Sequence, residues 1–192
     1  MADVLEADDK KIKISLLGVP SVGKTSIIKR ITDDAFTESY MATLGADFTS
    51  KKLSIPSKTG IVELEVQITE IGGQSIFEAL VTKFLHGTIC VIFVFDLSDP
   101  STLDGLHSWL EKLIIANVDK DVESILLIGN KSDLTYNKEE VKIKANQFLQ
   151  HAVKKIGYPI FSSYIETSAA TYTNVEEAFN LIGKHIVDNL KN

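Results

Sequence analysis

The fold is decided by residues 18–25, which read Gly-Val-Pro-Ser-Val-Gly-Lys-Thr. This run fits the pattern G-x-x-x-x-G-K-[ST], and it lies between a strand pattern over 11–17 and a helix pattern over about 25–33. Backbone N–H groups of such a turn surround an anion, and the following helix adds the positive end of its dipole. Because the strand and the helix are both in place, the run predicts a phosphate-binding loop rather than a chance match in an ordinary turn.

Two side chains of this loop have specific expected roles. Lys24 is expected to reach the β- and γ-phosphates of a nucleotide, which makes it a candidate catalytic residue as well as a binding residue. The Thr25 hydroxyl is expected to bind Mg²⁺. The pattern predicts phosphate binding and does not by itself select guanine. The nucleotide-binding positions expected in this segment are Gly18, Ser21, Val22, Gly23, Lys24, Thr25 and Ser26.

Outward from this loop, strand-like and helix-like patterns alternate, which predicts an α/β domain. We expect a three-layer P-loop NTPase fold: a six-stranded, mostly parallel sheet with one antiparallel strand and helices on both faces. Ligands of such sheets bind beyond the carboxyl ends of the strands. Residues 56–60 have hairpin chemistry, so the strands on either side of them are expected to be antiparallel. Strands are expected over 11–17, 45–55, 61–71, 89–95 and 125–129, with a sixth ending near 166; helices are expected over about 25–33, 76–85, 101–116, 138–155 and 174–190.

Composition and charge limit the classes of protein to which the chain can belong. Its 192 residues suit one domain, expected over 11–192 after a flexible acidic tail over 1–10. The net charge of -6 argues against a general nucleic-acid binder, which needs a basic face. No apolar run approaches the ~18 residues of a membrane helix. The single cysteine, Cys90, cannot form an internal disulfide and indicates a reducing compartment.

Two further segments at strand ends indicate which base is bound. Residues 130–133 read Asn-Lys-Ser-Asp. The Asp133 carboxylate can accept hydrogen bonds from N1–H and the exocyclic amine of guanine, and adenine offers neither donor. The Lys131 stem would pack along the ring, and Asn130 would tie this loop to the phosphate loop. The second segment, Glu-Thr-Ser-Ala over 166–169, would direct the Ala169 N–H at guanine O6.

Either segment alone is weak, because Asn-Lys-x-Asp after a strand is usually an Asx turn. Three motifs at successive strand ends, in the order that a nucleotide requires, predict a bound guanine nucleotide. The residues expected around the base are Asn130, Lys131, Asp133, Ser168, Ala169 and Ala170.

By these motifs the chain resembles the Ras superfamily of small GTPases over roughly residues 11–187, with Rab-like features. Residues 40–48 are similar to the first switch of Rab proteins and the segment that follows it. Phe-Leu-His-Gly over 84–87, Trp-Leu over 109–110 and Asn-Val-Glu-Glu-Ala-Phe over 174–179 match further Rab patterns. The resemblance implies the G-domain fold and a guanine-nucleotide switch that binds GTP or GDP with Mg²⁺ and slowly hydrolyses GTP.

The resemblance also implies roles for five residues between the motifs. It assigns Thr43 to the Mg²⁺ ion and the γ-phosphate, Phe36 to the base, and Tyr40 to a position over the phosphates. Gly73 would donate its N–H to the γ-phosphate. Gln74 would orient the attacking water, as a second candidate catalytic residue.

Two loops, around 36–48 and 70–84, would be released on hydrolysis, when the Thr43 and Gly73 contacts are lost. The resemblance implies three protein partners: an effector that reads these loops, an exchange factor and a GTPase-activating protein. Residues 188–192 contain no cysteine for prenylation, so no direct lipid anchor is expected. We expect a cytoplasmic monomer, or recruitment to a membrane through a partner.

Three positions depart from the family pattern. Glu70 stands where the family carries the aspartate that holds a water of the Mg²⁺ shell. Because Mg²⁺ demands near-octahedral geometry, the longer side chain is expected to alter metal affinity or nucleotide exchange, or to coordinate the ion directly. Pro20 lacks an N–H and replaces glycine or serine, and we expect slow hydrolysis. Ala170 replaces a lysine and removes a minor contact with the base. The expected metal residues are Thr25, Thr43 and Glu70.

Two other functions stay open. Glu70 and Pro20 would also suit an interaction module that binds GTP or GDP with little or no hydrolysis. An ATP-using kinase or ATPase with the same phosphate loop is disfavoured by the sequence over 130–133. The four histidines are scattered along the chain and suggest no metal cluster.

Overall fold

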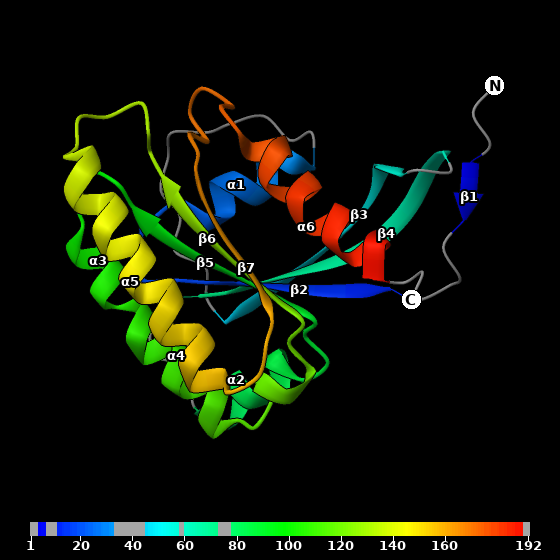
Figure 1. Cartoon of the computed structure of the whole chain (residues 1–192), viewed down its shortest axis with the longest axis horizontal. Helices are drawn as coiled ribbons and strands as arrows, with labels where there is room; N and C mark the ends of the chain where they lie inside the picture. The colour runs from blue at the N-terminus through cyan, green and yellow to red at the C-terminus, as the bar shows by residue number, and fades with distance from the viewer. Residues whose placement is uncertain (1–3, 7–10, 33–44, 58–59, 73–77, 190–192) are drawn as a thin grey trace.

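One mixed sheet forms the centre of the molecule in the computed structural model, which describes residues 4–6, 11–32, 45–57, 60–72 and 78–189 (Figure 1). Its order is β1-β4-β2-β5-β6-β7, and β3 pairs with β4 off this path. The β3–β4 pair is antiparallel and the other pairs are parallel. The predicted six-stranded, mostly parallel sheet with one antiparallel strand is confirmed in β2 to β7. The strands are β1 (Val4–Glu6), β2 (Ile12–Leu17), β3 (Ala46–Ser57), β4 (Gly60–Ile71), β5 (Cys90–Asp96), β6 (Ser124–Asn130) and β7 (Phe161–Glu166).

β1 is an addition to this sheet, and it lies inside the segment 1–10 that the sequence suggested was a flexible tail. Val4 pairs with Ile61 of β4, and Ile12 of β2 pairs with Val66 further along the same strand. β3 occupies the other edge of β4 along its whole length. Because β4 has 12 residues and β2 only 6, the remaining part of this edge is open to β1. The rest of 1–10, apart from 4–6, lies outside the described residues.

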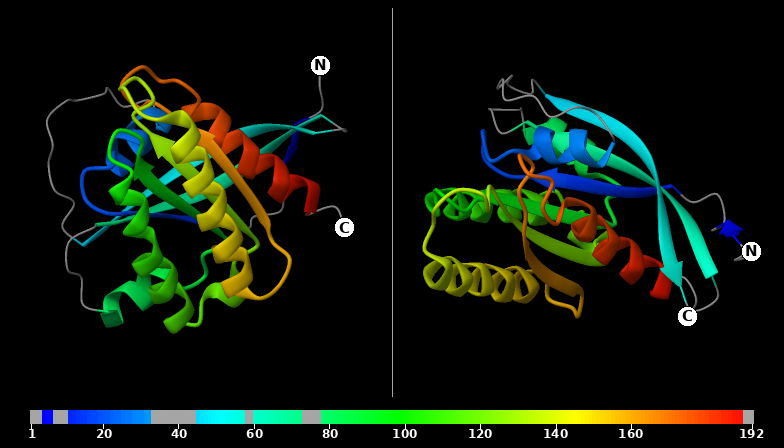
Figure 2. Two further views of the ribbon diagram at one scale, coloured as in Figure 1. Left: turned by 60° about the vertical axis from the view of Figure 1, so that its left-hand side comes forward. Right: turned by 90° about the horizontal axis from the view of Figure 1, so that it is seen from above.

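The β3–β4 hairpin is longer than its turn residues suggested. Residues 56–60 were expected to form the turn, yet Pro56 pairs with Ile61 and Ser57 pairs with Gly60 inside the ladder. A proline has no N–H to donate and is tolerated on edge strands. Among the described strands β3 pairs with β4 alone, so Pro56 does not interrupt the sheet. The long, twisted hairpin extends beyond the neighbouring strands in Figure 2.

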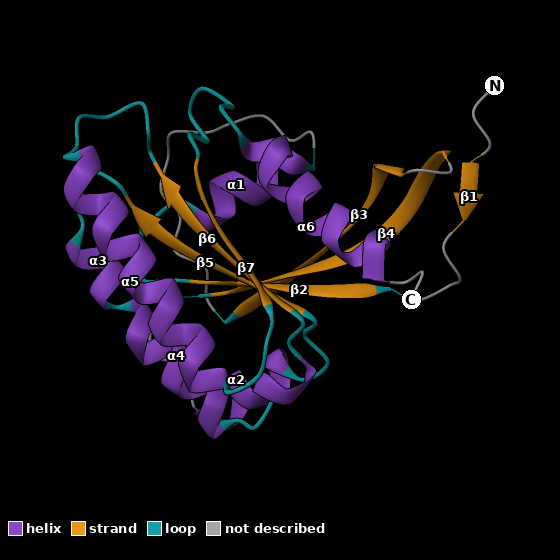
Figure 3. Ribbon diagram, viewed as in Figure 1, coloured by secondary structure: helices purple, strands orange, loops and turns teal. Residues whose placement is uncertain are grey.

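Helices cover both faces of the sheet, as Figure 3 shows. The helices α1 (Lys24–Ile31) and α6 (Val175–Asn189) lie on one face. The other face carries α2 (Glu78–Leu85), α3 (Ser101–Asp104), α4 (Leu106–Ile115) and α5 (Lys138–Ile156), and the short turn η1 (Asp119–Asp121) leads into β6. The single helix predicted over 101–116 is divided at Gly105. None of the helices in the described part of the chain is long and apolar enough to cross a membrane.

The division at Gly105 lies against the phosphate loop. A Cβ on Gly105 would come within 2.3 Å of Val19 Cγ1, so the α3–α4 junction approaches this loop more closely than any other residue type allows. The backbone of Gly105 keeps helical angles, φ -63 and ψ -20, so α3 and α4 continue in nearly one direction. The sequence pattern for one helix was therefore close to the structure, and only the hydrogen-bond ladder is interrupted.

Two apolar cores hold these layers together, one on each face. All seven residues of β5 are buried, as expected of a central parallel strand. Cys90, Ile92 and Val94 enter the core beneath α1 and α6, whereas Val91, Phe93 and Phe95 enter the core beneath α2 to α5. Burial raises the pKa of the Cys90 thiol to about 12. Cys90 is thus a packing residue.

The sheet brings the predicted motifs to a single edge. β2, β4, β5, β6 and β7 are mutually parallel, so their carboxyl ends lie on the same side. The chain leaves β2 into the segment 18–23, β6 ends at Asn130 and β7 ends at Glu166. β4 brings Glu70 and β5 brings Asp96 to the same edge.

Candidate functional site

The segment 18–25 folds into a tight turn that only glycine permits at two positions. Gly23 has φ 97, in the left-handed region, and Ser21, two residues earlier, has φ 67. A Cβ on Gly23 would lie 2.2 Å from Asn130 Nδ2, and a Cβ on Gly18 would lie 2.4 Å from the Val94 carbonyl oxygen. Both glycines therefore permit close packing of the loop against neighbouring strand ends. Residue 26 follows in the first turn of α1.

Lys24 is the first residue of α1 and is 5% exposed. Its Nζ donates to the carbonyl oxygens of Gly18, at 3.0 Å, and Val19, at 3.1 Å, so the side chain folds back over its own loop. Burial lowers the pKa of Lys24 from 10.5 to about 8, although the nearby Glu70 carboxylate acts to raise it. A buried cation without a strong anionic partner suits a site that receives an anion.

Thr25 and Glu70 place side-chain oxygen atoms that could bind a metal ion near the Lys24 ammonium. The Thr25 hydroxyl donates to Glu70 Oε1 at 2.6 Å, and the Glu70 side chain is buried, with 3% exposed. Hydroxyl and carboxylate oxygens are the ligands that Mg²⁺ prefers, and the ion usually completes its shell with waters and substrate phosphates. The pair fits a magnesium site shared with a phosphate ligand. Within the described ranges, no group of three or more His, Cys, Asp or Glu residues could hold a metal by itself.

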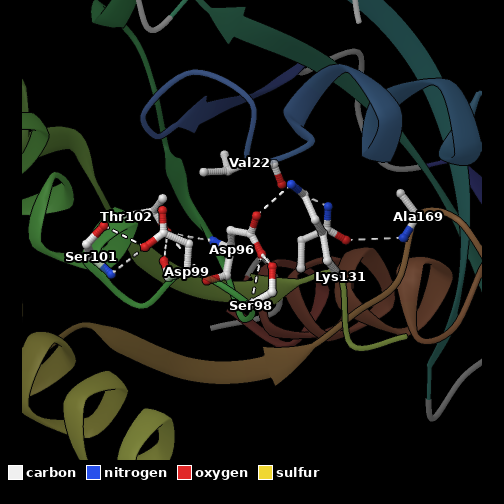
Figure 4. A network of polar contacts seen from close by, with 9 residues as sticks. Val22, Asp96, Ser98, Asp99, Ser101, Thr102, Lys131 and Ala169 are labelled. Carbon is white, nitrogen blue, oxygen red and sulfur yellow. Dashed lines mark hydrogen bonds and ion pairs between the residues drawn. The ribbon is translucent and has the colours of Figure 1, made fainter. Parts of the chain in front are cut away.

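Asn130, at the end of β6, joins the phosphate loop to the segment 166–169. Its Nδ2 donates to the Val22 carbonyl oxygen at 2.9 Å. Its Oδ1 accepts from the Thr167 hydroxyl at 3.1 Å. The same oxygen accepts from the Ala169 N–H, also at 3.1 Å (Figure 4). The Val22 side chain itself is fully buried, so its contribution to a ligand site comes from its backbone. This is the connection between the loops that the sequence predicted for Asn130.

Lys131 is held by a residue to which the sequence analysis gave no role. Its Nζ forms an ion pair with Asp96 Oδ2 at 2.5 Å, and Lys131 has a left-handed backbone, φ 68. Burial acts to raise the pKa of Asp96, but hydrogen bonds from Lys131 and Ser98 outweigh it and the pKa lies below its usual range. Asp96 and Asn130 are paired in register on neighbouring strands, which places Lys131 beside Asp96.

The loop that follows β5 supports Asp96 in turn. The Asp96 N–H donates to the Thr102 hydroxyl at 2.9 Å, and the Ser98 hydroxyl donates to Asp96 Oδ1 at 2.6 Å (Figure 4). The Ser101 hydroxyl donates to Asp99 Oδ1, also at 2.6 Å. These short local hydrogen bonds close the loop on itself, so the carboxylate that receives Lys131 has a defined position.

Asp133 lies against the segment 166–169. The Ser168 hydroxyl donates to Asp133 Oδ1 and accepts from the Thr171 N–H at 3.1 Å. The Ser132 N–H donates to the Thr167 carbonyl oxygen at 3.0 Å, a second connection between the two loops. Ser168 thus fixes one oxygen of the carboxylate.

Two tyrosines fix the end of β7, where this segment begins. Tyr136 donates to Glu166 Oε2 at 2.6 Å and Tyr164 donates to Glu166 Oε1 at 3.0 Å. Burial, followed by the effect of Glu166, raises the pKa of Tyr136 to about 12 and also raises that of Tyr164. The Asn174 side chain donates to the Glu166 carbonyl oxygen at 2.9 Å. Side chain and backbone of Glu166 are both held, so the following loop starts from a fixed point.

Arg30 of α1 also binds the loop that follows β7. Its Nε donates to the Ala169 carbonyl oxygen at 2.7 Å, and its Nη2 donates to the Ala170 carbonyl oxygen at 2.8 Å. Ala169 is buried and Ala170 is exposed. The loop after β7 is therefore attached to Asn130 through an N–H and to α1 through two carbonyl groups.

The structure brings together most of the residues expected at the site: the phosphate loop, Glu70, the 130–133 segment and the 166–170 segment. Five expected residues lie outside the described part of the chain: Phe36, Tyr40, Thr43, Gly73 and Gln74. Sequence reasoning gave no role to Asp96, Thr167 or Arg30. Asp96 carried one signal, its position directly after a buried strand, and Thr167 stood inside a quoted motif. Arg30 carried another signal, because it is the only arginine in the chain.

Comparison with known proteins agrees with this geometry. A model of the Ras family matches residues 13–188. The chain is 31% identical to Ras-related protein Rab-13 of Mesocricetus auratus over 183 residues, which cover 95% of this chain and 83% of that protein. It is 32% identical to the Ypt/Rab-type GTPase ypt7 of Pyricularia oryzae over 177 residues, covering 91% and 81%. It is 31% identical to GTP-binding protein YPTM2 of Zea mays over 182 residues, covering 95% and 83%.

The family match spans almost the entire sheet and every strand-end motif described above. The relatives align over most of their own lengths, so the similarity concerns the whole domain and not the phosphate loop alone. The segments 18–25, 130–133 and 166–170 all lie inside the range that the Ras family model matches. The chain belongs to the Ras family, as a GTP-binding switch protein related to the Rab and Ypt GTPases.

Proposed function

We propose that this chain binds GTP or GDP with Mg²⁺ and hydrolyses GTP slowly, so that the loops around 36–48 and 70–84 differ between its two nucleotide states. The observation that carries the proposal is the Asn130 connection. One side chain ties the phosphate loop, through Val22, to the segment that contains Ala169. Phosphate binding and base selection are therefore parts of one site.

Base selection rests on Asp133 and Ala169. The Ser168 hydroxyl holds one oxygen of the Asp133 carboxylate, which supports a fixed acceptor for N1–H and the 2-amino group of guanine. The Ala169 N–H donates to Asn130 Oδ1 without ligand, and guanine O6 would share or replace that acceptor. The Lys131 stem would lie along the ring while its amine stays near Asp96. Adenine offers neither of these two donors, so it would leave the Asp133 acceptor unpaired, which supports rejection of adenine.

Magnesium would be held by Thr25, Thr43 and Glu70 together with phosphate oxygens. When bound, the ion supplies positive charge that stabilises the negative charge of the phosphates. The 2.6 Å contact between Glu70 and the Thr25 hydroxyl supports direct coordination, because the carboxylate already reaches an expected inner ligand. The longer side chain would thus take the place of a water that a shorter aspartate holds.

Hydrolysis would depend on Gln74, which would orient the attacking water, and on Lys24, which would stabilise charge on the phosphates. Gly73 would donate to the γ-phosphate. The chain's only arginine contacts Ala169 and Ala170, on the base side, so a catalytic arginine would have to come from another protein. Intrinsic Ras-type rates without such an arginine are ~10⁻⁴ s⁻¹. A GTPase-activating protein, an exchange factor and an effector are the partners that this function requires.

Competition between GTP and ATP for the purified chain, followed by single-turnover hydrolysis of bound GTP, tests the proposal. We expect GTP to compete at least about 10⁴-fold better than ATP. We also expect slow GDP formation that Gln74→Leu reduces further. Equal competition by ATP would contradict the guanine assignment. Tight GTP binding with no GDP formation in either variant would favour the interaction module without hydrolysis.

A further inference from the structure

We propose that Arg30 is a positioning residue that sets how strongly this chain discriminates at position 6 of the purine. The inference rests on the proposed guanine-nucleotide function. It adds a residue that lies outside the motifs at 18–25, 130–133 and 166–169. Arg30 touches no part of the expected ligand. It would act through the loop of Ala169 and Ala170, whose backbone faces that position.

The contacts of Arg30 fix two consecutive peptide groups. Nε binds the Ala169 carbonyl at 2.7 Å and Nη2 binds the Ala170 carbonyl at 2.8 Å. In the same loop, the Ala169 N–H donates to Asn130 Oδ1 at 3.1 Å. Both the N–H and the carbonyl group of Ala169 are thus hydrogen-bonded, which restricts the direction of the N–H before a base binds.

The choice of arginine at this position supports a geometric role. The chain contains 20 lysine and arginine residues in total, and Arg30 is its only arginine. A guanidinium presents several N–H donors in a rigid plane, whereas a lysine ammonium acts as a single flexible point charge. Two carbonyl groups bound through separate nitrogens use that planar fork. The Tyr172 ring of the same loop lies 6.0 Å from the guanidinium carbon, which adds a weak cation–π contact.

Arg30 also connects the two halves of the site. It lies in α1, whose first residue is Lys24 of the phosphate loop, and it reaches the loop after β7. A shift of that loop relative to α1 would move the base contact relative to the phosphate contact. The Arg30 guanidinium therefore sets the distance between the phosphate contact and the base contact. A base with a larger atom at position 6 does not fit this distance and is rejected.

Two analogues of GDP separate this effect from the effect of Asp133. In 6-thio-GDP a sulfur replaces O6, while N1–H and the 2-amino group remain. In inosine diphosphate O6 and N1–H remain, while the 2-amino group is missing. We expect the wild-type chain to bind GDP about tenfold more tightly than 6-thio-GDP, because sulfur is larger and a weaker acceptor than oxygen.

The variants are Arg30→Lys, Arg30→Ala and Lys155→Ala. Lys155→Ala is the matched control, since it removes a cation whose 2.9 Å ion pair is with Glu111 on the α4–α5 surface. In both Arg30 variants the GDP preference over 6-thio-GDP should fall to within about threefold, while the preference over inosine diphosphate is retained. The control should keep both ratios. Far-ultraviolet circular dichroism checks that each variant is folded, and Arg30→Lys serves if Arg30→Ala does not fold.

Three results would overturn the assignment of Arg30. They are an unchanged GDP to 6-thio-GDP ratio in folded Arg30→Lys, an equal loss of affinity for all three nucleotides, and the same change in Lys155→Ala. Failure of the proposed function looks different, because the wild-type chain would then bind neither GDP nor inosine diphosphate, or would bind ADP equally well. The wild-type titration therefore tests the function, and the variant ratios test Arg30.

Discussion

At the scale of single residues, Lys24 and Asp96 differ in whether a side chain of opposite charge is bound to them. Lys24 is buried against carbonyl oxygens, and its pKa is lowered to about 8. Asp96 has a direct cationic partner in Lys131 and keeps its pKa below the usual range. The charge of Asp96 is balanced by Lys131, whereas the Lys24 ammonium is expected to gain an anionic partner when a nucleotide phosphate binds. This difference makes Lys24 the residue at which ligand binding should couple to protons.

The first prediction concerns pH. Between pH about 8 and 10.5 the unfolded chain holds the Lys24 proton and the folded, nucleotide-free chain does not. The free energy of unfolding therefore rises with pH in this window, by roughly 3 kcal/mol in total from this group. A bound polyphosphate would restore the proton, so GDP affinity should fall by up to about tenfold per pH unit above 8.

Titration calorimetry in buffers of different ionisation enthalpy measures this coupling. We expect uptake of close to one proton per GDP at pH 9 and almost none at pH 7. Lys24→Met should abolish the difference between the two pH values. Equal proton uptake at both values in the wild-type chain would show that Lys24 does not change its protonation state on binding.

The second prediction concerns Glu70. If its carboxylate coordinates the ion directly, Glu70→Gln should weaken Mg²⁺ binding roughly tenfold or more, because a charged ligand becomes neutral. Glu70→Asp should also change the affinity, since the shorter side chain cannot make the same contact with the Thr25 hydroxyl. The GDP release rate as a function of free Mg²⁺ gives the affinity. If Glu70→Asp leaves Mg²⁺ affinity, nucleotide exchange and hydrolysis unchanged, this role of Glu70 is wrong.

At the scale of elements, the close approach of α6 to β3 limits which residue types position 183 can hold. Gly183 lies inside α6, where it is buried against β3. A Cβ at this position would lie 2.4 Å from Ile55 Cδ1 and 2.8 Å from Ile55 Cγ1. Ile55 is itself fully buried and has little room to move. The packing of α6 on β3 therefore depends on the missing side chain.

The third prediction is that Gly183→Ala destabilises the domain. Alanine favours a helix over glycine by up to ~1 kcal/mol, but overpacking a buried contact costs about 1–3 kcal/mol, so the steric effect should win. Ile55→Val removes Cδ1 and should recover part of the loss. Urea unfolding of the two single variants and the double variant measures the coupling. A stabilised Gly183→Ala variant, or strictly additive losses, would contradict this packing.

The elements were largely predictable because their signals are local. The sequence patterns predicted five strands with their ranges and the end of a sixth near residue 166, and strand-turn-helix chemistry located the phosphate loop. The differences arise where a partner element decides the outcome. Pro56 stays in a strand because β3 is paired on one side only in the described sheet. Gly105 lies where a Cβ would meet Val19, and β1 pairs with the part of β4 that extends beyond β2.

At the scale of the whole molecule, sheet order determines which motifs meet. The sequence shows that residues 130–133 and 166–169 follow strands, and the resemblance to small GTPases places both at one ligand. The Lys131–Asp96 pair could not be predicted from a pattern, because it requires β5 and β6 to be neighbours in the register that pairs Asp96 with Asn130. Arg30 likewise meets Ala169 only after α1 packs beside the loop that follows β7.

A single site is expected to bind phosphates at one end and guanine at the other. Affinities of GDP, inosine diphosphate and ADP for wild-type, Lys24→Ala and Asp133→Ala chains test this most directly. We predict that Lys24→Ala weakens GDP and inosine diphosphate alike. We predict that Asp133→Ala weakens GDP at least about a hundredfold and removes its advantage over inosine diphosphate. Folded variants that both bind GDP as tightly as the wild-type chain would contradict the account.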